Sequence, residues 1–395
     1  MNLAINKIHS PQTYTSVVYP PWPVYAADEI AAVNEVLHSG KVNYWTGEKT
    51  KQFEKAFVET IGVEYGIALT NGTVAIELAL LGLGIGAGDE VILPCRGFIA
   101  TASAVVSRGA IPILTDVDPI SQNISLETLL PHISINTRAI IVVHHAGWPV
   151  DLDPIIEFTK ANGIYLIEDC AQAHGARYRD RSVGSYADVA TFSFCQDKIM
   201  STGGEGGMVV TPHEDVWRRM WSYKDHGKNY DAAMNRSHQP GYRWLHDDFG
   251  TNWRMTEIQA AIGLCQLQKL QHWVETRRRN ADYLTQGLAS VPRIVTKVAN
   301  HPRFYHAYYK YYAFAESAER RDYILMSIVA KGIPCTVGSC SNFYKEKAFA
   351  KLQLPYASAM PVSECLSETS LVFQVHPGCD ESTMKRIVEE IGNII

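Results

Sequence analysis

The amino-acid sequence predicts an α/β fold: a three-layer α/β/α body with a mostly parallel sheet, followed by a smaller C-terminal α+β domain. Short apolar runs rich in β-branched residues recur over residues 66–211 and alternate with helical patterns. This alternation is typical of parallel strands that are covered on both faces. A long helical stretch then leads to a strand-like run and two more helical patterns. With 395 residues, 46% of them hydrophobic, the chain can bury a core of this size.

The first segments lie before the predicted sheet. Residues 1–25 are polar and carry several prolines, which favours an extended arm. Residues 26–40 show helical periodicity and end at Gly40, so we expect a helix that closes on a glycine cap. Its apolar residues fall on one face: Ile30, Val33, Val36 and Leu37. A second amphipathic helix is expected over residues 49–62.

The body follows as alternating strands and helices. The runs that predict strands are GIALT (66–70), EVILP (90–94), IPILTDV (111–117), RAIIVVH (138–144), GIYLIED (163–169), DVATFSF (188–194) and GGMVVT (206–211). Residues 72–84 and 152–163 read as helices between them. Residues 255–288 predict one long helix that bridges to the second domain. We therefore expect an arm over residues 1–25, a large domain over 26–265 and a small domain over 266–395.

Charge and cysteine content limit the possible functions. The net charge is −5, from 36 Lys plus Arg against 41 Asp plus Glu, which argues against nucleic acid or an anionic membrane as the main partner. The eight cysteines are scattered and form no CxxC pair, as in proteins with reduced thiols. The N-terminus has no apolar signal region, and no stretch is long and apolar enough to span a bilayer. These features predict a soluble, cytoplasmic protein.

Three features stand where open α/β sheets bind ligands, at the carboxyl ends of strands. Asp169 ends one predicted strand, and Lys198 follows another by four residues. Partial burial favours the neutral amine of a lysine, which is the form that performs Schiff-base chemistry. Gly72 and Thr73 lie between a strand and a helix, where free backbone N–H groups favour a phosphate.

Each feature also has an ordinary structural interpretation. Asp169 could cap the next turn, Lys198 could be solvated, and the turn at Gly72 could simply begin a helix. The order of the three along one α/β body is the informative observation. His144 and His145 have no Cys, Asp or Glu at ligand spacing beside them in the sequence, so no metal site is expected.

Longer motifs carry a resemblance to a known family. They are NGTVAIELALLGLGIGAGDEVILP, GFIATASAVVSRGAIPILTDVDP, VVHHAGWPVDLDPI, IEDCAQAHGA, FSFCQDKIMSTGGEGGMVVT and TNWRMTEIQAAIGLCQL. In order and spacing they resemble the DegT/StrS family of pyridoxal-phosphate-dependent sugar aminotransferases, which have fold-type I. The resemblance covers about residues 44 to 290, well over half of the chain.

The resemblance implies a role for each matching residue. Lys198 matches the lysine that joins the cofactor covalently and later moves the proton, and Asp169 matches the carboxylate that pairs with the pyridine nitrogen. Gln172 matches the side chain beside the phenolic oxygen. The other implied cofactor contacts are Gly72, Thr73 and Ser193 at the phosphate, Phe98 over the ring, and Asn252 reaching the phosphate from a partner subunit. Taken alone, Phe98 is more typical of a core residue, and Asn252 could merely stabilise a turn.

The substrate side rests on fewer residues. Trp45 and Thr46 lie in a segment that resembles the family's substrate-side loop. The stretch 225–250 reads as a long loop with cationic and aromatic residues, among them Arg243, which could contact a diphosphate or be a solvated face.

The resemblance implies a homodimer with shared active sites that transfers an amino group, from glutamate, to the keto sugar of a nucleotide diphosphate. Its cofactor would be pyridoxal 5'-phosphate, with pyridoxamine phosphate as the intermediate form. Two alternatives are a pyridoxamine-phosphate-dependent sugar dehydratase of the same family, and a binding or regulatory protein that keeps only the fold. The family's dehydratases replace the lysine by histidine, so Lys198 counts against the first alternative. Retention of Lys198, Asp169 and Gln172 together counts against the second.

Overall fold

The computed structural model describes residues 19–237, 240–299, 301–338, 342–352 and 360–395. Its main sheet has seven strands in the order β1-β9-β8-β5-β4-β2-β3. They are β1 (Tyr65–Leu69), β2 (Glu90–Pro94), β3 (Ile111–Thr115), β4 (Thr137–Val143), β5 (Tyr165–Asp169), β8 (Val189–Ser193) and β9 (Gly207–Thr211). β9 runs antiparallel to both of its neighbours, β1 and β8, and the other four pairs of this sheet are parallel. The predicted mostly parallel sheet is therefore confirmed.

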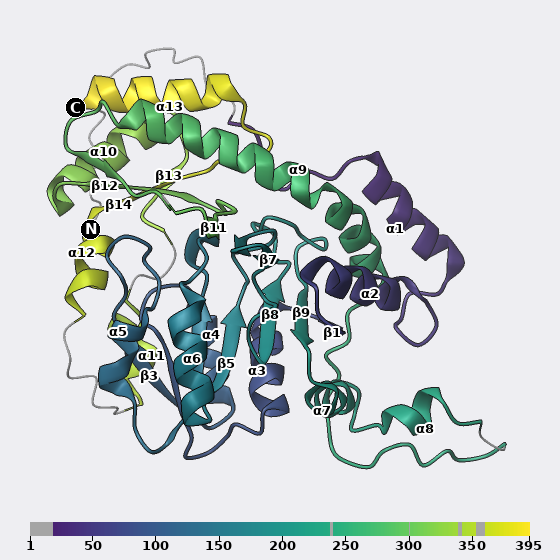
Figure 1. Cartoon of the computed structure of the whole chain (residues 1–395). Coiled ribbons are helices and arrows are strands. Elements are labelled where there is room, and N and C mark those ends of the chain that lie inside the picture. The colour runs from purple at the N-terminus through teal and green to yellow at the C-terminus, as the bar shows by residue number, and fades with distance from the viewer. Residues whose placement is uncertain (1–18, 238–239, 300, 339–341, 353–359) are drawn as a thin grey trace, which may run out of the picture.

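Helices cover both faces of this sheet (Figure 1). Alternating side chains of β2 show the two layers: Ile92 packs in the cluster that contains Phe53 and Ile155, while Val91 and Leu93 pack in the opposite cluster. The first layer contains α2 (Lys49–Ile61) and α6 (Leu152–Asn162), and the second contains α3 (Gly72–Gly82), α4 (Ala100–Ser107) and α7 (Glu214–Lys224). The three-layer α/β/α body is confirmed.

A second, antiparallel sheet forms the C-terminal part, in the order β10-β12-β14-β13. Its strands are β10 (Ile294–Thr296), β12 (Tyr311–Ala315), β13 (Cys335–Thr336) and β14 (Ser370–Phe373). The helices that accompany it are α10 (Ala318–Ala330), α12 (Pro361–Thr369) and α13 (Glu381–Ile394). A separate core gathers the inner faces of these elements. The predicted smaller α+β part is present.

The helix α9 (Glu257–Leu288) joins the two cores. Leu270 packs in the core of the main sheet, and Leu284 packs in the C-terminal core. The predicted division between residues 265 and 266 falls inside this helix and stays a prediction. Although α9 has 32 residues, neither it nor any other helix in the described ranges combines the length and apolarity needed to cross a membrane.

Smaller elements complete the connections. A three-stranded sheet pairs β11 (Phe304–Tyr305) with β6 (Arg177–Tyr178), which pairs with β7 (Arg181–Ser182). It ties the C-terminal part to the large body. The remaining short helices are α5 (Leu126–Leu129), η1 (Leu130–His132), η2 (His145–Gly147), α8 (Tyr230–Met234), η3 (Phe343–Lys345) and α11 (Lys347–Ala350).

The helix α1 (Ala27–Ser39) ends at Gly40 in the left-handed conformation, as expected. Its apolar face is only partly used, because Ile30 and Leu37 are 56% and 53% exposed. The buried side carries Val36 and Glu29, whose carboxylate pairs with Lys269 of α9. A polar contact therefore fixes α1 against α9 and leaves an apolar strip uncovered.

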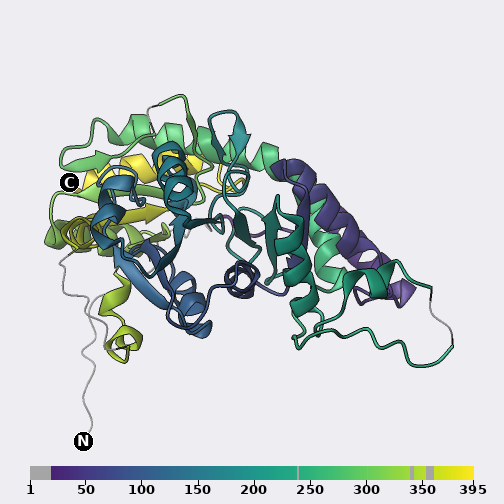
Figure 2. The same ribbon diagram turned by 60° about the horizontal axis from the view of Figure 1, so that its bottom comes forward.

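The stretch 225–250 is mostly loop, as predicted, apart from α8. Figures 1 and 2 both show the segment after α8 extending away from the body. Its aromatic side chains lie open to solvent, with Tyr242 89%, Trp244 86% and Phe249 95% exposed. Residues 238 and 239 of this segment lie outside the described residues, as do residues 1–18 of the predicted arm.

Candidate active site

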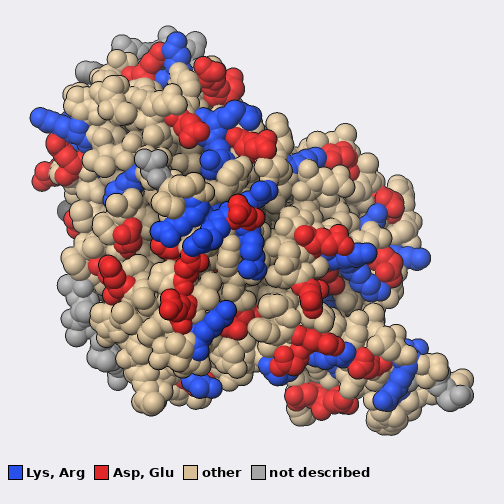
Figure 3. Space-filling view, viewed as in Figure 1, with Lys and Arg blue, Asp and Glu red and all other residues tan. Residues whose placement is uncertain are grey.

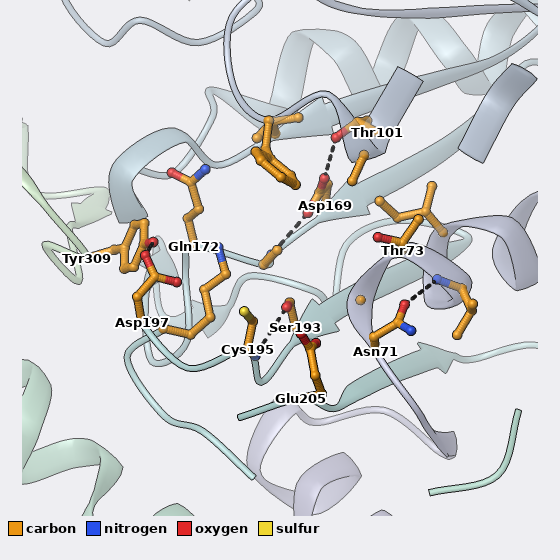
Figure 4. Close-up of a pocket in the computed structure, with 18 residues that line it drawn as sticks. Asn71, Thr73, Thr101, Asp169, Gln172, Ser193, Cys195, Asp197, Glu205 and Tyr309 are labelled. Atoms are coloured by element: carbon orange, nitrogen blue, oxygen red, sulfur yellow. Dashed lines mark hydrogen bonds between the residues drawn. The ribbon is translucent and has the colours of Figure 1, made fainter. Parts of the chain in front are cut away.

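The carboxyl ends of β5 and β8 and the N-terminus of α3 open onto one cavity of about 580 Å³. This is the edge at which open α/β sheets bind ligands. Of the residues predicted for catalysis and cofactor binding, the cavity is lined by Gly72, Thr73, Phe98, Asp169, Gln172, Ser193 and Lys198. Figure 4 shows the side chains of Thr73, Asp169, Gln172 and Ser193 around this space. The structure thus brings these seven residues together, and their individual roles stay a prediction.

Asp169 is a buried carboxylate held in a fixed orientation. Its Oδ2 accepts a hydrogen bond from Thr101 Oγ1 at 2.8 Å, and its Oδ1 accepts one from the Ala171 amide at 3.0 Å. Burial raises the pKa of the Asp169 carboxyl, whereas these hydrogen bonds and the charge of Lys198 act in the opposite direction. A buried anion that faces a cavity is stabilised by a cation, so this position suits a protonated ring nitrogen.

The phosphate end of the predicted site is formed by α3 and β8. The Asn71 side chain accepts from the Val74 amide at 3.0 Å, so the amides of Gly72 and Thr73 remain available as donors at the helix N-terminus. A Cβ at Gly72 would lie 2.5 Å from Ser193 Cβ and 2.9 Å from its Oγ. Only glycine therefore allows the Ser193 hydroxyl to approach this helix end, where a phosphate is favoured.

We expect Gly72→Ala to weaken cofactor binding, because the added methyl group collides with Ser193 and opens the phosphate corner. The loss in binding free energy should be about 1–3 kcal/mol, the usual cost of overpacking. Equilibrium dialysis of the cofactor measures this loss. Gly86→Ala is the matched control, since the nearest heavy atom to its Cβ is a carbonyl oxygen at 3.8 Å. Equal dissociation constants for the two variants would contradict this prediction.

Lys198 lies in the turn after β8, where its backbone amide donates a hydrogen bond to the Cys195 carbonyl at 3.1 Å. Its Nζ lies 4.8 Å from the ring centroid of Tyr309, a residue of the C-terminal part. In the described chain no carboxylate forms an ion pair with this amine, although Asp197 lies nearby and binds the Tyr309 hydroxyl. Lys198 is partly buried and lines the cavity. Because no ion pair with a described residue holds its amine, the amine is available for covalent chemistry.

Gln172 and Phe98 lie at other walls of the cavity. The Gln172 Oε1 accepts from the Ala146 amide at 2.8 Å, and Ala146 adopts a left-handed backbone with φ 57°. This bond fixes the side chain, and no described residue accepts from its amide nitrogen, which is left as a donor for a ligand oxygen. Phe98 is 52% exposed, so it is not the ordinary core residue of the alternative interpretation.

Four predicted residues do not line this cavity within one chain. Asn252 and Thr46 are exposed, and Arg243 is exposed on the loop that extends from the body. Trp45 lies beside Trp221, with Lys228 Nζ 4.5 Å from its ring centroid. Within one chain these four residues do not contact the cavity, and their contacts with the cofactor or the substrate stay a prediction.

Sequence reasoning missed several lining residues, and three of them carry polar groups that contact predicted site residues or their neighbours: Thr101, Asp197 and Tyr309. Thr101 lies in the first turn of α4, three residues after Phe98, and its closeness to that residue in sequence is the one signal that could have identified it. Asp197 precedes Lys198 directly but has no feature that separates it from a surface acid. Tyr309 arrives from the second sheet region, and nothing in its own segment predicts this contact.

A second group of possible ligands lies behind the sheet and serves the fold. His144, Glu168 and Cys170 have polar atoms within 4.8 Å of one another. However, His144 Nε2 binds Glu168 Oε2 at 3.0 Å, and His144 Nδ1 accepts from the Val150 amide. Glu168 also accepts from three backbone amides, at Gly184, Tyr186 and Ala187. These bonds explain its complete burial without a metal.

Comparison with known proteins agrees with this geometry. GDP-perosamine synthase from Caulobacter vibrioides is 34% identical over 352 residues, which cover 87% of this chain and 89% of that protein. The crystal structure of an aminotransferase from Psychrobacter cryohalolentis superposes with a TM-score of 0.92 at 46% identity, covering 95% and 98% of the two chains. That of S. venezuelae DesV in complex with a ketimine intermediate gives 0.84 at 30% identity, covering 93% and 94%.

The family match extends beyond the motifs that carry the resemblance. Those motifs lie between about residues 44 and 290, whereas the match runs over residues 23–392 and so includes α1 and the C-terminal sheet. The sequence, the fold and the arrangement of the cavity thus agree. The chain belongs to the DegT/DnrJ/EryC1/StrS aminotransferase family.

Proposed function

We propose that this chain is a pyridoxal-phosphate-dependent aminotransferase that transfers an amino group from glutamate to the keto group of a nucleotide-diphosphate sugar. The observation that carries the proposal is the meeting of Lys198, Asp169 and the N-terminus of α3 around one cavity. Family membership supports the reaction. The name GDP-perosamine synthase and the ketimine intermediate bound to DesV support the substrate class and the cofactor.

The cavity residues fit this cofactor. Pyridoxal phosphate, when bound, supplies an aldehyde that takes up the donor's amino group and a ring that withdraws electrons from the carbon losing its proton. We assign Lys198 to hold the aldehyde carbon covalently and, once released, to move the proton at the substrate carbon. Asp169 would hold the protonated ring nitrogen, and Gln172 would donate to the phenolic oxygen. Phe98 would cover one face of the ring.

The phosphate would be held by the amides at the start of α3 and by the hydroxyls of Thr73 and Ser193. The macrodipole of α3 favours a dianion at this end. Because these donors belong to a helix and a strand, they hold the cofactor while Lys198 is free to leave and return. Anchoring at the phosphate therefore lets the same lysine serve both half-reactions.

The two alternative functions are less favoured. A dehydratase of this family would need histidine in place of Lys198. A protein that only binds would have no need of a buried carboxylate and an amine on two walls of one cavity. The binding-only alternative also does not account for Asp169, whose burial is unfavourable without a cationic ligand.

We further propose a homodimer in which each cavity takes residues from both subunits. Exposed apolar side chains lie on α1 and on the loop after α8, and an apolar surface of this kind marks interaction sites. Asn252 and Arg243 lie outside the cavity of their own chain, so they are free to contribute to the cavity of a partner. In the dimer, Asn252 would reach the phosphate, and Arg243, Trp45 and Thr46 would contact the nucleotide sugar.

This arrangement predicts complementation between two inactive chains. Lys198→Ala removes the amine and Asn252→Ala removes the partner's phosphate contact, so a heterodimer of the two variants keeps one intact site. We expect such heterodimers, isolated with two different affinity tags, to show about half of the wild-type kcat per dimer, as a twofold-symmetric pair requires. If Lys198 and Asn252 of one and the same chain served a site together, the heterodimer would be no more active than the mean of the two homodimers.

The function itself is tested with the wild-type protein, pyridoxal phosphate and glutamate. A panel of nucleotide-diphosphate sugars with a ketone at C3 or C4 serves as acceptor. We expect one of them to yield an amino sugar with one equivalent of 2-oxoglutarate, and ping-pong kinetics. Release of water from the sugar ring without amine transfer would instead support the dehydratase, and no cofactor binding would support the protein that keeps only the fold.

We also infer a cytoplasmic location. All seven described cysteines are free, and four of them (Cys95, Cys170, Cys335 and Cys379) are buried. Unpaired thiols persist in reducing compartments.

A further inference from the structure

The described end of the N-terminal segment passes beside the turn that carries Lys198. The Trp22 indole Nε1 donates a hydrogen bond to the Lys198 carbonyl oxygen at 2.9 Å, across 176 residues of sequence. In the described part of the chain, no backbone amide donates to that carbonyl. Lys198 lies beyond the end of β8, so the sheet ladder does not fix its backbone. Trp22 adds a second constraint to the bond between the Lys198 amide and the Cys195 carbonyl.

The Trp22 ring is itself held firmly. It stacks on His376 with ring centroids 5.5 Å apart, and it meets Trp273 of α9 edge to face at 5.1 Å. The Arg277 guanidinium lies 5.0 Å from its centroid. These contacts come from the C-terminal part and from α9, so the indole N–H has a defined direction toward the Lys198 turn.

Arg277 links the Trp22 ring to the segment that carries Tyr309. Its Nη1 donates to the carbonyls of Tyr308 and Tyr309, at 3.4 and 3.2 Å. Its Nε and Nη2 have no hydrogen-bond partner among the described residues, although the side chain is buried. The Trp22 ring, 5.0 Å away, adds a cation–π contact that stabilises this buried charge.

Tyr309 completes the arrangement. Its ring lies 4.8 Å from Lys198 Nζ, and its hydroxyl binds Asp197, the neighbour of Lys198. Trp22 thus contacts the lysine backbone directly and, through Arg277, the segment between β11 and β12 that places Tyr309 against the lysine amine. Trp22 therefore helps to place both the backbone of Lys198 and, through Arg277 and Tyr309, its side-chain amine.

We propose that Trp22 is a positioning residue for Lys198, which holds the lysine so that its amine faces the cofactor carbon. The inference rests on the proposed role of Lys198 as the residue that carries the cofactor. Reactions of this kind depend on placement, because a misplacement of about 1 Å can cost about 100-fold in rate. The N-terminal segment, outside both sheets, would then be part of the reaction's geometry.

The test compares Trp22→Phe with Tyr19→Phe. The first removes the N–H donor and keeps an aromatic ring. The second removes the Tyr19 hydroxyl, which binds the Gln374 carbonyl at 3.0 Å and contacts Cys379, and so weakens the same segment without touching the Lys198 turn. Apo protein is mixed with pyridoxal phosphate, and the rate of covalent capture at Lys198 is followed by borohydride trapping and peptide mapping.

We expect Trp22→Phe to slow capture and lower kcat by roughly 10- to 100-fold, with the KM for glutamate changed by less than about twofold. Tyr19→Phe should capture the cofactor at the wild-type rate, whatever its effect on the melting temperature. Trp22→His, which keeps a ring N–H, should capture faster than Trp22→Phe. Packing volume alone would give the reverse order, because phenylalanine is closer to tryptophan in size.

Two results would overturn the positioning role: wild-type capture by Trp22→Phe, or an equal loss in Tyr19→Phe. Failure of the wild-type protein to capture the cofactor on Lys198 is a different result. It would refute the proposed function and remove the basis of this inference with it.

Discussion

Lys198→Ala is expected to lower kcat for amine transfer by roughly four orders of magnitude or more, as removal of an essential nucleophile does. The amine lines the cavity, and among the described residues no carboxylate holds it in an ion pair. Without it, the chain has no group at this position to carry the cofactor or to move the proton at the substrate carbon. Single-turnover kinetics with glutamate measure the loss.

The control for this substitution is Lys160→Ala, which removes an exposed lysine at the end of α6. It should retain wild-type kcat, and circular dichroism should show both variants folded. A Lys198→Ala protein with more than a few per cent of wild-type turnover would refute the assignment of this residue.

Asp169→Asn is expected to lower kcat by roughly 10²- to 10³-fold, the size seen when one preorganised electrostatic partner is removed. The amide has nearly the same shape, so its oxygen can still accept from the Ala171 amide, and its nitrogen can donate to Thr101 Oγ1, while the charge is lost. A neutral partner no longer favours a protonated ring nitrogen, and electrons from the deprotonated carbon are withdrawn less effectively. The rate of proton removal, followed with deuterated glutamate, reports this step.

Thr101→Val separates charge from orientation at the same carboxylate. It removes the 2.8 Å hydrogen bond and keeps the anion, so we expect less than about a tenfold loss in kcat, the order of one hydrogen bond. Equal losses in Asp169→Asn and Thr101→Val would show that orientation dominates and that charge contributes little.

Much of the fold follows from local patterns. Each predicted strand of the body coincides with a strand of the main sheet, because continuous apolar runs such as residues 138–144 have to be buried on both faces. Gly40 marks the end of α1 as its left-handed conformation requires. The pattern could not reveal that Ile30 and Leu37 would be exposed, since a sequence shows that a face is apolar but not what covers it.

The site residues that lie at or just after the end of a strand were predictable from the sequence. Asp169, Ser193 and Lys198 lie at the ends of buried runs, and parallel strands bring such ends to one edge. Trp22 and Tyr309 were not predictable, because they reach the Lys198 turn from distant parts of the chain and no local pattern encodes a tertiary contact. Their aromatic character alone is typical of core residues.

The most direct test of the central claim is a peptide map of the protein after incubation with pyridoxal phosphate and reduction with borohydride. The account predicts a pyridoxyl group on Lys198, and the same map of Lys198→Ala without that label. A label on another lysine such as Lys310, or none on the wild-type protein, would contradict it.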